Sequence, residues 1–239
     1  MKLKLNLKQT MCMVGLSVLL GCTQKFNDVK ETMSLALLGP SDVIVPAKTI
    51  DELPYASLYA KMAGSGQAFM VLGYATPSDS APIEKTKFKQ LKWLSSNHEM
   101  IVTEAGRIIK TVGLSEINLT ASYAETADPL ALGLHLKSTP TTWQRQVDWQ
   151  PGHHVGYLMR SQFKFQAAQS KVINERQIHT LYYTELVTLP ELELTFTNHF
   201  WIDPNSGRVI ASIQQPAPYM SPIELTILKP YANSEEAPQ

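Results

Sequence analysis

The chain has 239 residues, and its 21 Lys and Arg balance 21 Asp and Glu to a formal net charge of +0. Nucleic-acid-binding domains need clustered Lys and Arg to displace phosphate counterions, so this balance argues against nucleic acid as a partner. Apolar residues make up 44% of the chain and charged residues 18%, which is ordinary for a globular fold.

The first 22 residues combine a basic start, an apolar run and a cysteine. Three lysines precede the apolar run at residues 11–20, and Gly21 and Cys22 close it. Roughly ten apolar residues are too few for a helix across a bilayer of about 30 Å, but they match the core of an export signal. We therefore expect cleavage between Gly21 and Cys22 and acylation of Cys22, which anchors the chain in a lipid bilayer. The alternative is an ordinary secretory signal with an incidental cysteine.

Cleavage at this point changes the charge and the cysteine count of the mature chain. It removes three lysines and no acid, leaving 18 basic against 21 acidic residues, a formal charge of −3. It also removes Cys12, so with Cys22 acylated the folded part has no disulfide and no Cys-x-x-Cys metal site.

Four segments follow from this pattern. We expect a signal peptide at 1–21, a lipidated tether at 22–26, one β-rich domain at 27–232 and a disordered tail at 233–239.

Two short helices are predicted near the N-terminus. The first covers residues 29–38, where Asn27 or Asp28 can cap its start and Gly39-Pro40 ends it. The second covers residues 51–62, which lack the alternation of a strand.

From residue 67 onward the sequence favours strands, because β-branched and aromatic residues alternate with polar ones between turn residues. Glu104–Gly106 and Asp203–Gly207 are predicted turns of two hairpins. Residues 77–89 form a predicted exposed loop. The predicted strands cover residues 68–74, 92–95, 99–103, 107–112, 141–150, 155–166, 177–186, 192–202, 208–215 and 223–228. The prediction is therefore a mainly β, antiparallel barrel-like or sandwich fold with one or two short N-terminal helices.

The residues that can carry chemistry form no catalytic motif. His153 and His154 are adjacent and would point to opposite faces of an extended chain, so they cannot share a metal ion without a special turn. Glu191 and Glu193 are spaced to share one strand face, where general acid/base work and a solvated strand edge are the alternatives. No Gly-x-Ser-x-Gly nucleophile motif or phosphate-binding glycine loop occurs. We predict no cofactor, no metal and no catalytic residue.

Aromatic residues are the candidates for ligand binding. Trp143, Trp149 and Tyr157 lie in the predicted strands, where rings either stack on sugars or fill the core of a barrel. Core packing is the more common role of strand aromatics. Trp149 lies at a strand end beside Gln150-Pro151-Gly152 and is the best candidate for an exposed ring.

Six segments of the chain carry a family resemblance. They are residues 53–59, 69–74, 92–95, 106–112, 198–207 and 222–230. Together they resemble the GfcB/YjbF family of lipoproteins, which is associated with Group 4 capsule and other exopolysaccharide operons. The resemblance is loose at 115–191, and residues 77–89 look like an insertion. It implies a barrel-like domain on a lipid anchor, and Thr23 in place of Asp after Cys22 then favours the outer membrane.

The leading hypothesis is a periplasm-facing accessory lipoprotein of a Gram-negative outer membrane that binds polysaccharide-export proteins or polysaccharide without catalysis. A glycan-modifying enzyme that uses Glu185, Glu191 or Glu193 is one alternative. A structural partner of an outer-membrane export pore is the other.

The Cys22→Ser variant tests the anchor. Serine offers no thiol for the diacylglycerol, so we expect unprocessed precursor and a defective surface polysaccharide, with mass spectrometry of the native protein finding acylated Cys22. Normal processing and normal polymer levels in the variant would contradict the prediction.

Overall fold

The computed structural model describes residues 41–78 and 89–232, and those from Asp42 onward belong to one compact unit. None of the described helices is long and apolar enough to cross a bilayer. The predicted signal peptide, the helix at 29–38, most of the loop at 77–89 and the tail lie outside the described residues. The elements are α3 (Ala47–Glu52), β1 (Ser57–Met62), β2 (Ala68–Pro77), β3 (Lys89–Leu94), β4 (Met100–Glu104), β5 (Arg107–Val112), β6 (Asn118–Tyr123), α4 (Pro129–Leu132), β7 (Thr142–Gln150), β8 (His154–Ile173), β9 (Arg176–Leu189), the 3₁₀ turn η1 (Pro190–Leu192), β10 (Leu194–Ile202), β11 (Val209–Gln214) and β12 (Ile223–Lys229).

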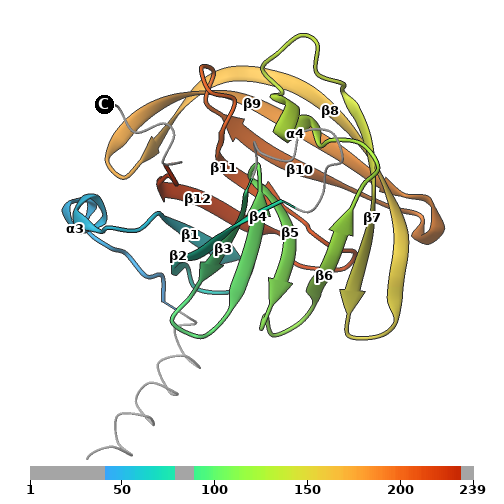
Figure 1. Ribbon diagram of the computed structural model, residues 1–239, viewed down its shortest axis with the longest axis horizontal. Coiled ribbons are helices and arrows are strands. Elements are labelled where there is room, and N and C mark those ends of the chain that lie inside the picture. The colour runs from blue at the N-terminus through green and yellow to red at the C-terminus, as the bar shows by residue number, and fades with distance from the viewer. Residues whose placement is uncertain (1–40, 79–88, 233–239) are drawn as a thin grey trace, which may run out of the picture. The chain divides into compact units, whose positions relative to one another are not determined.

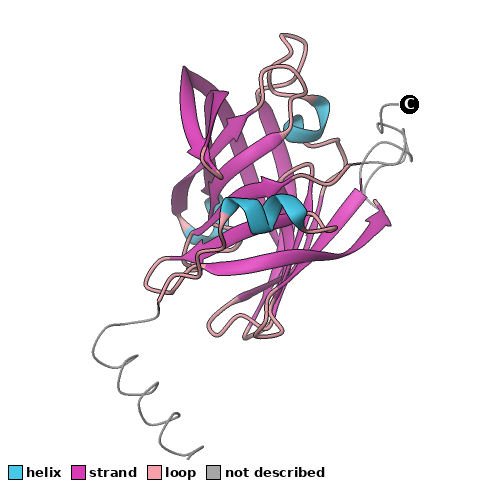
Figure 2. Ribbon diagram, turned by 90° about the vertical axis from the view of Figure 1, so that its left-hand side faces the viewer, coloured by secondary structure: helices cyan, strands magenta, loops and turns pink. Residues whose placement is uncertain are grey.

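The strands form one antiparallel sheet of 12 strands in the order β5-β4-β3-β2-β1-β12-β11-β10-β9-β8-β7-β6. The sheet curves round on itself (Figures 1 and 2), and its two end strands, β5 and β6, lie next to each other (Figure 1). Across this seam the Leu119 amide donates to the Thr111 hydroxyl at 2.9 Å. The predicted antiparallel fold is confirmed as a nearly closed barrel rather than a sandwich.

Most predicted strands are confirmed, and both predicted hairpins form. Ala105 and Gly106 turn the chain between β4 and β5 with φ of 47° and 87°, the left-handed values that a two-residue hairpin turn requires. Between β10 and β11 the Asp203 carboxylate accepts the Asn205 amide at 2.9 Å and the Ser206 hydroxyl at 2.8 Å. The residues of the two turns therefore fix where both hairpins reverse direction, as the sequence indicated.

The predicted helix at 51–62 is wrong. The helix α3 ends at Glu52, and β1 follows it and pairs with β2 on one side and β12 on the other. Pro54 explains the end of the helix, because a proline disfavours helical geometry in the residue before it. The prediction also missed the short helix α4, whose N-cap is Asp128, and the strand β6.

The hairpin of β8 and β9 is much longer than predicted, and its tip reaches α3 (Figure 1). Asp51 of α3 accepts hydrogen bonds from Arg176 at 2.7 Å and from Asn174 at 3.3 Å, both at the tip. The Lys229 ammonium of β12 donates to the Asp51 carbonyl at 2.9 Å. Asp51 therefore connects the hairpin tip to the end of β12.

The apolar core has three parts. The main cluster fills the barrel with residues such as Leu58, Trp93 and Met159, and a second one gathers at α4 around Leu130, Trp143, Phe163 and Phe200. The third packs Ile173 and Ile178 of the long hairpin against Trp201 and Leu228. The end of the hairpin thus covers a part of the sheet outside the main core.

Gly106 is a position where the backbone demands glycine. It has a φ of 87°, and a Cβ built on it lies 2.4 Å from the Cβ of Val209. We expect Gly106→Ala to lower the free energy of unfolding by about 3 kcal/mol, from left-handed strain and overpacking together. Urea denaturation measures the change.

Gly64 provides the matched control, because its φ is 80° but a Cβ there meets nothing within 4 Å. Gly64→Ala should cost about 1 kcal/mol, the strain alone. Equal losses in the two variants would show that the contact with Val209 plays no part.

Candidate functional site

The candidate site is built on β7, whose side chains alternate between the interior and the surface. Trp143 and Arg145 point inward and are buried, while Gln144 and Gln146 are exposed. The strand pairs with β8 from Thr142 onward, but β6 ends at Tyr123, opposite Gln146. No described strand therefore covers residues 142–145 on the β6 side.

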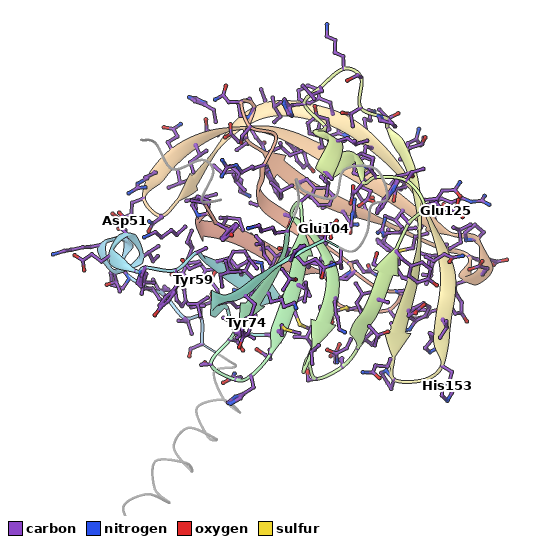
Figure 3. All side chains as sticks on the ribbon, viewed as in Figure 1. Asp51, Tyr59, Tyr74, Glu104, Glu125 and His153 are labelled. Atoms are coloured by element: carbon purple, nitrogen blue, oxygen red, sulfur yellow. The ribbon has the colours of Figure 1, made fainter. Side chains whose placement is uncertain are left out.

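A groove lies at this uncovered part of β7, and we call it the β7 groove. Its volume is about 850 Å³. The connection from β6 to α4 forms one wall, and Figure 3 places Glu125 of that connection beside β7. Eight of the twelve lining residues are Glu, Thr, Gln, Arg or Ser. The lining residues are Tyr123, Ala124, Glu125, Thr126, Thr142, Trp143, Gln144, Arg145, Gln146, Leu158, Arg160 and Ser161.

The inner side of the groove rests on a buried carboxylate, Glu185 of β9, which is 0% exposed. Its Oε1 accepts Arg145 Nη1 at 3.0 Å and the Ser161 hydroxyl at 2.6 Å. Its Oε2 accepts Arg107 Nη1 at 3.0 Å and Asn198 Nδ2 at 2.8 Å. Four donors from four strands thus satisfy both oxygens.

Asp128 completes the network at the start of α4. Its carboxylate pairs with Arg107, and it also accepts the Leu130 amide at 2.9 Å as the cap of the helix. The two guanidinium groups and the two carboxylates sum to no net charge. Arg107 and Arg145 lie 4.7 Å and 5.1 Å from the Trp143 ring, so cation–π contacts add to the ion pairs.

Burial by itself raises the pKa of the Glu185 carboxyl, but the charges of Arg107 and Arg145 lower that pKa to about 2. Burial lowers the pKa of Arg145. For Arg107 burial acts the same way, but the charges of Asp128 and Glu185 outweigh it and raise the pKa. Glu185 is thus a fixed anion at neutral pH, without a proton to donate.

A second set of buried polar groups spans the barrel. Gln214 of β11 accepts the Ile108 amide at 3.0 Å and donates to the Gly106 carbonyl at 2.8 Å. Asn198 accepts the Gln215 amide at 2.8 Å. Since β5 and β11 are not neighbours in the sheet, Gln214 ties two opposite strands together through the interior.

The model of a protein family described as "Group 4 capsule polysaccharide lipoprotein gfcB, YjbF" matches residues 30–228. The chain belongs to this family. The uncharacterized lipoprotein GfcB of Escherichia coli (strain K12) is 32% identical over 213 residues, which is 89% of this chain and 94% of that protein. The uncharacterized lipoprotein YjbF of the same strain is 25% identical over 213 residues, 89% of this chain and 93% of that protein.

A solved structure has the same fold as this chain. The crystal structure of the hypothetical lipoprotein YmcC from Escherichia coli (K12) aligns with a TM-score of 0.67 at 31% identity. The alignment covers 84% of this chain and 96% of that chain. The family resemblance predicted from the sequence is confirmed.

The three aromatic residues proposed for ligand binding do not form one surface in this GfcB/YjbF member. Trp143 lines the β7 groove but is only 8% exposed, and its Nε1 donates to the Thr126 carbonyl at 3.1 Å. Trp149 is 4% exposed, so the expected exposed ring is instead in the main core. Tyr157 packs against it with ring centroids 4.6 Å apart. A role for the three in binding stays a prediction.

The predicted strand position of Glu191 and Glu193 is wrong. Pro190 begins the 3₁₀ turn η1 that separates β9 from β10, and Glu193 follows with a left-handed φ of 51°. The Glu191 carboxylate accepts the Leu158 amide at 3.2 Å. The two carboxyls therefore do not share the face of a strand.

The adjacent histidines lie at the turn between β7 and β8. His154 stacks on Trp149 with ring centroids 4.5 Å apart, and Figure 3 shows His153 at the opposite end of β7 from Glu125. Within residues 41–78 and 89–232, no three His, Cys, Asp or Glu side chains are placed to hold a metal ion.

Of the residues that make the network and the groove, sequence reasoning named only Glu185, as a possible catalytic carboxylate, and Trp143, as a possible ligand-binding ring. The signal for one of the others was present: the alternation of β7 places Arg145 inward between Trp143 and Val147. A buried arginine requires an acidic partner. The sequence does not show that this partner is Glu185, which lies 40 residues further along the chain on another strand.

We expect Glu185→Gln to lower the free energy of unfolding by about 3–5 kcal/mol, because it leaves two buried guanidinium groups with one remaining carboxylate. Chemical denaturation at neutral pH measures the loss. The exposed Glu116 is the matched control, and Glu116→Gln should change stability by no more than about 0.5 kcal/mol.

The pH dependence checks the same prediction. The pKa of Glu185 falls from its ordinary 4.5 to about 2 on folding, so its stabilisation is complete above pH 4.5 and is lost as the pH approaches 2. The stability difference between wild type and Glu185→Gln should therefore shrink over that interval. A difference that stays constant from pH 5 to pH 2 would contradict the charge network.

Proposed function

We propose that this chain is a lipid-anchored accessory protein of capsule or exopolysaccharide production or export that acts by binding. The observation that carries the proposal is membership of a family described as Group 4 capsule polysaccharide lipoproteins. Both curated relatives carry the name lipoprotein, which supports acylated Cys22 as the anchor. The proposed location is the periplasmic face of the outer membrane, where Thr23 after Cys22 favours sorting.

The carboxylates favour binding over catalysis. A glycosidase holds two carboxyl groups about 5 to 9.5 Å apart across the scissile bond. Glu125 is the one acidic side chain among the described residues that line the β7 groove. Glu185 behind the groove is saturated by four donors and has a lowered pKa, so it is unsuited to act as a general acid.

Deletion of the gene should reduce the polysaccharide on the cell surface, and the wild-type chain should restore it. Glu191→Ala and Glu193→Ala should restore it fully, because neither carboxylate has a catalytic role in the proposal. Quantifying extracted surface polysaccharide, with immunoblots for protein level, gives the result.

Two outcomes would count against the proposal. Unchanged polysaccharide after deletion would overturn the accessory role. Failure of either glutamate variant, at normal protein level, would favour the enzyme alternative instead.

A further inference from the structure

We infer that the β7 groove binds a segment of polysaccharide and recognises its hydroxyl groups rather than its charge. This rests on the proposed function, since it names the ligand class and the residues. The groove volume of about 850 Å³ falls within the range of roughly 300–1,000 Å³ that ligand pockets occupy.

The side chains on the outer side of the groove suit hydroxyl groups. Gln144 and Gln146 each offer a carbonyl acceptor and two amide donors, and Arg160, paired with Gln144 across the strands, offers five donors. Among the described residues, none forms a side-chain hydrogen bond or ion pair with these three side chains. Their donors and acceptors therefore face solvent, available to a ligand rich in hydroxyls.

Tyr123 gives the groove an apolar surface at one end. Tyr123 pairs with Gln146, is the last residue of β6 and is 44% exposed. An exposed tyrosine ring can pack against the apolar face of a sugar while its hydroxyl stays hydrated. Leu158, which pairs with Gln146 from the other side, also lines the groove. Tyr123, Gln146 and Leu158 thus form one row across three strands, and Gln144 and Arg160 form the next row on the same face.

The charges around the groove nearly cancel. Arg160 and Glu125 on its walls are opposite in sign, and the four charges behind Trp143 sum to zero. A strongly anionic polymer would need a cluster of unpaired cations, which these described residues do not supply. The geometry therefore points to a neutral or weakly charged glycan and a binding affinity that changes little with salt.

A peptide strand added to the edge of β7 is the competing occupant. The uncovered edge consists of residues 142–145 only, which span about 13 Å at the rise of a strand. Tyr123 and residues 124–126 border this edge. Strand addition draws its affinity from a run of backbone hydrogen bonds, which so short an edge limits. The polar side chains around the edge favour the glycan.

The test is binding of the full chain, in detergent micelles, to surface polysaccharide purified from the host strain, measured by calorimetry. Tyr123→Ala and the double variant Gln144→Ala/Arg160→Ala should each weaken binding at least about tenfold. Raising the salt from 50 to 500 mM should change the affinity less than about threefold.

Exposed residues that do not line the groove supply matched controls. Tyr74→Ala on β2 replaces a ring that is 64% exposed, and Gln169→Ala replaces an exposed amide on β8. Both should bind as wild type. Hydrogen exchange should show that the polysaccharide protects the amides of residues 142–146.

The outcomes separate this inference from the proposed function. Binding that the groove variants leave unchanged, or protection elsewhere, would overturn the groove while leaving the accessory role in place. If the wild-type chain does not bind the polysaccharide but gene deletion still reduces surface polysaccharide, the groove inference is also overturned and the accessory role stays in place. Protection of residues 142–146 by an export protein and not by the polymer would show that the groove takes a polypeptide.

Discussion

The ionised carboxylate of Glu185 is the constraint on which the interior of this barrel depends. An unpaired buried charge costs several kcal/mol, so the fold must bring compensating donors to it. Arg107, Arg145, Ser161 and Asn198 come from four strands, and each must keep its register for the carboxylate to be satisfied. A slip of one residue in any of these strands would turn its donor outward. The network therefore specifies the pairing of the strands as well as stabilising it.

The same network shapes the surface of the candidate site. Glu185 holds Arg145 and Ser161 on the inner side of β7 and β8, so Gln144 and Arg160 between them are turned outward. The groove itself arises because β6 stops at Tyr123 while β7 continues. Interior electrostatics thus set the orientation of the side chains, and the length of one short strand opens the space in front of them.

Much of the fold could be read from the sequence, because period-two alternation and turn residues are local signals. Strands such as β4, β5, β10 and β11 with their turns followed from these. Errors arose where a local signal was weak or ambiguous: residues 57–62 lack clear alternation because neither face of β1 is exposed to solvent. The site was harder to predict from the sequence, because Arg145 and Glu185 are brought together only by the pairing of strands. Where β6 ends relative to β7 is likewise a property of the sheet, and no residue motif records it.

The junction around Asp51 has a mechanical consequence. Its carboxylate holds Arg176 and Asn174 of the long hairpin, and its carbonyl receives Lys229 of β12. The chain reaches this point through Asp42 and Val43, which bond to Lys61 and Gln67 at 2.8 Å and 2.9 Å. A pull on the chain ahead of Asp42 therefore loads these contacts before it reaches the backbone pairing of β1 with its neighbours.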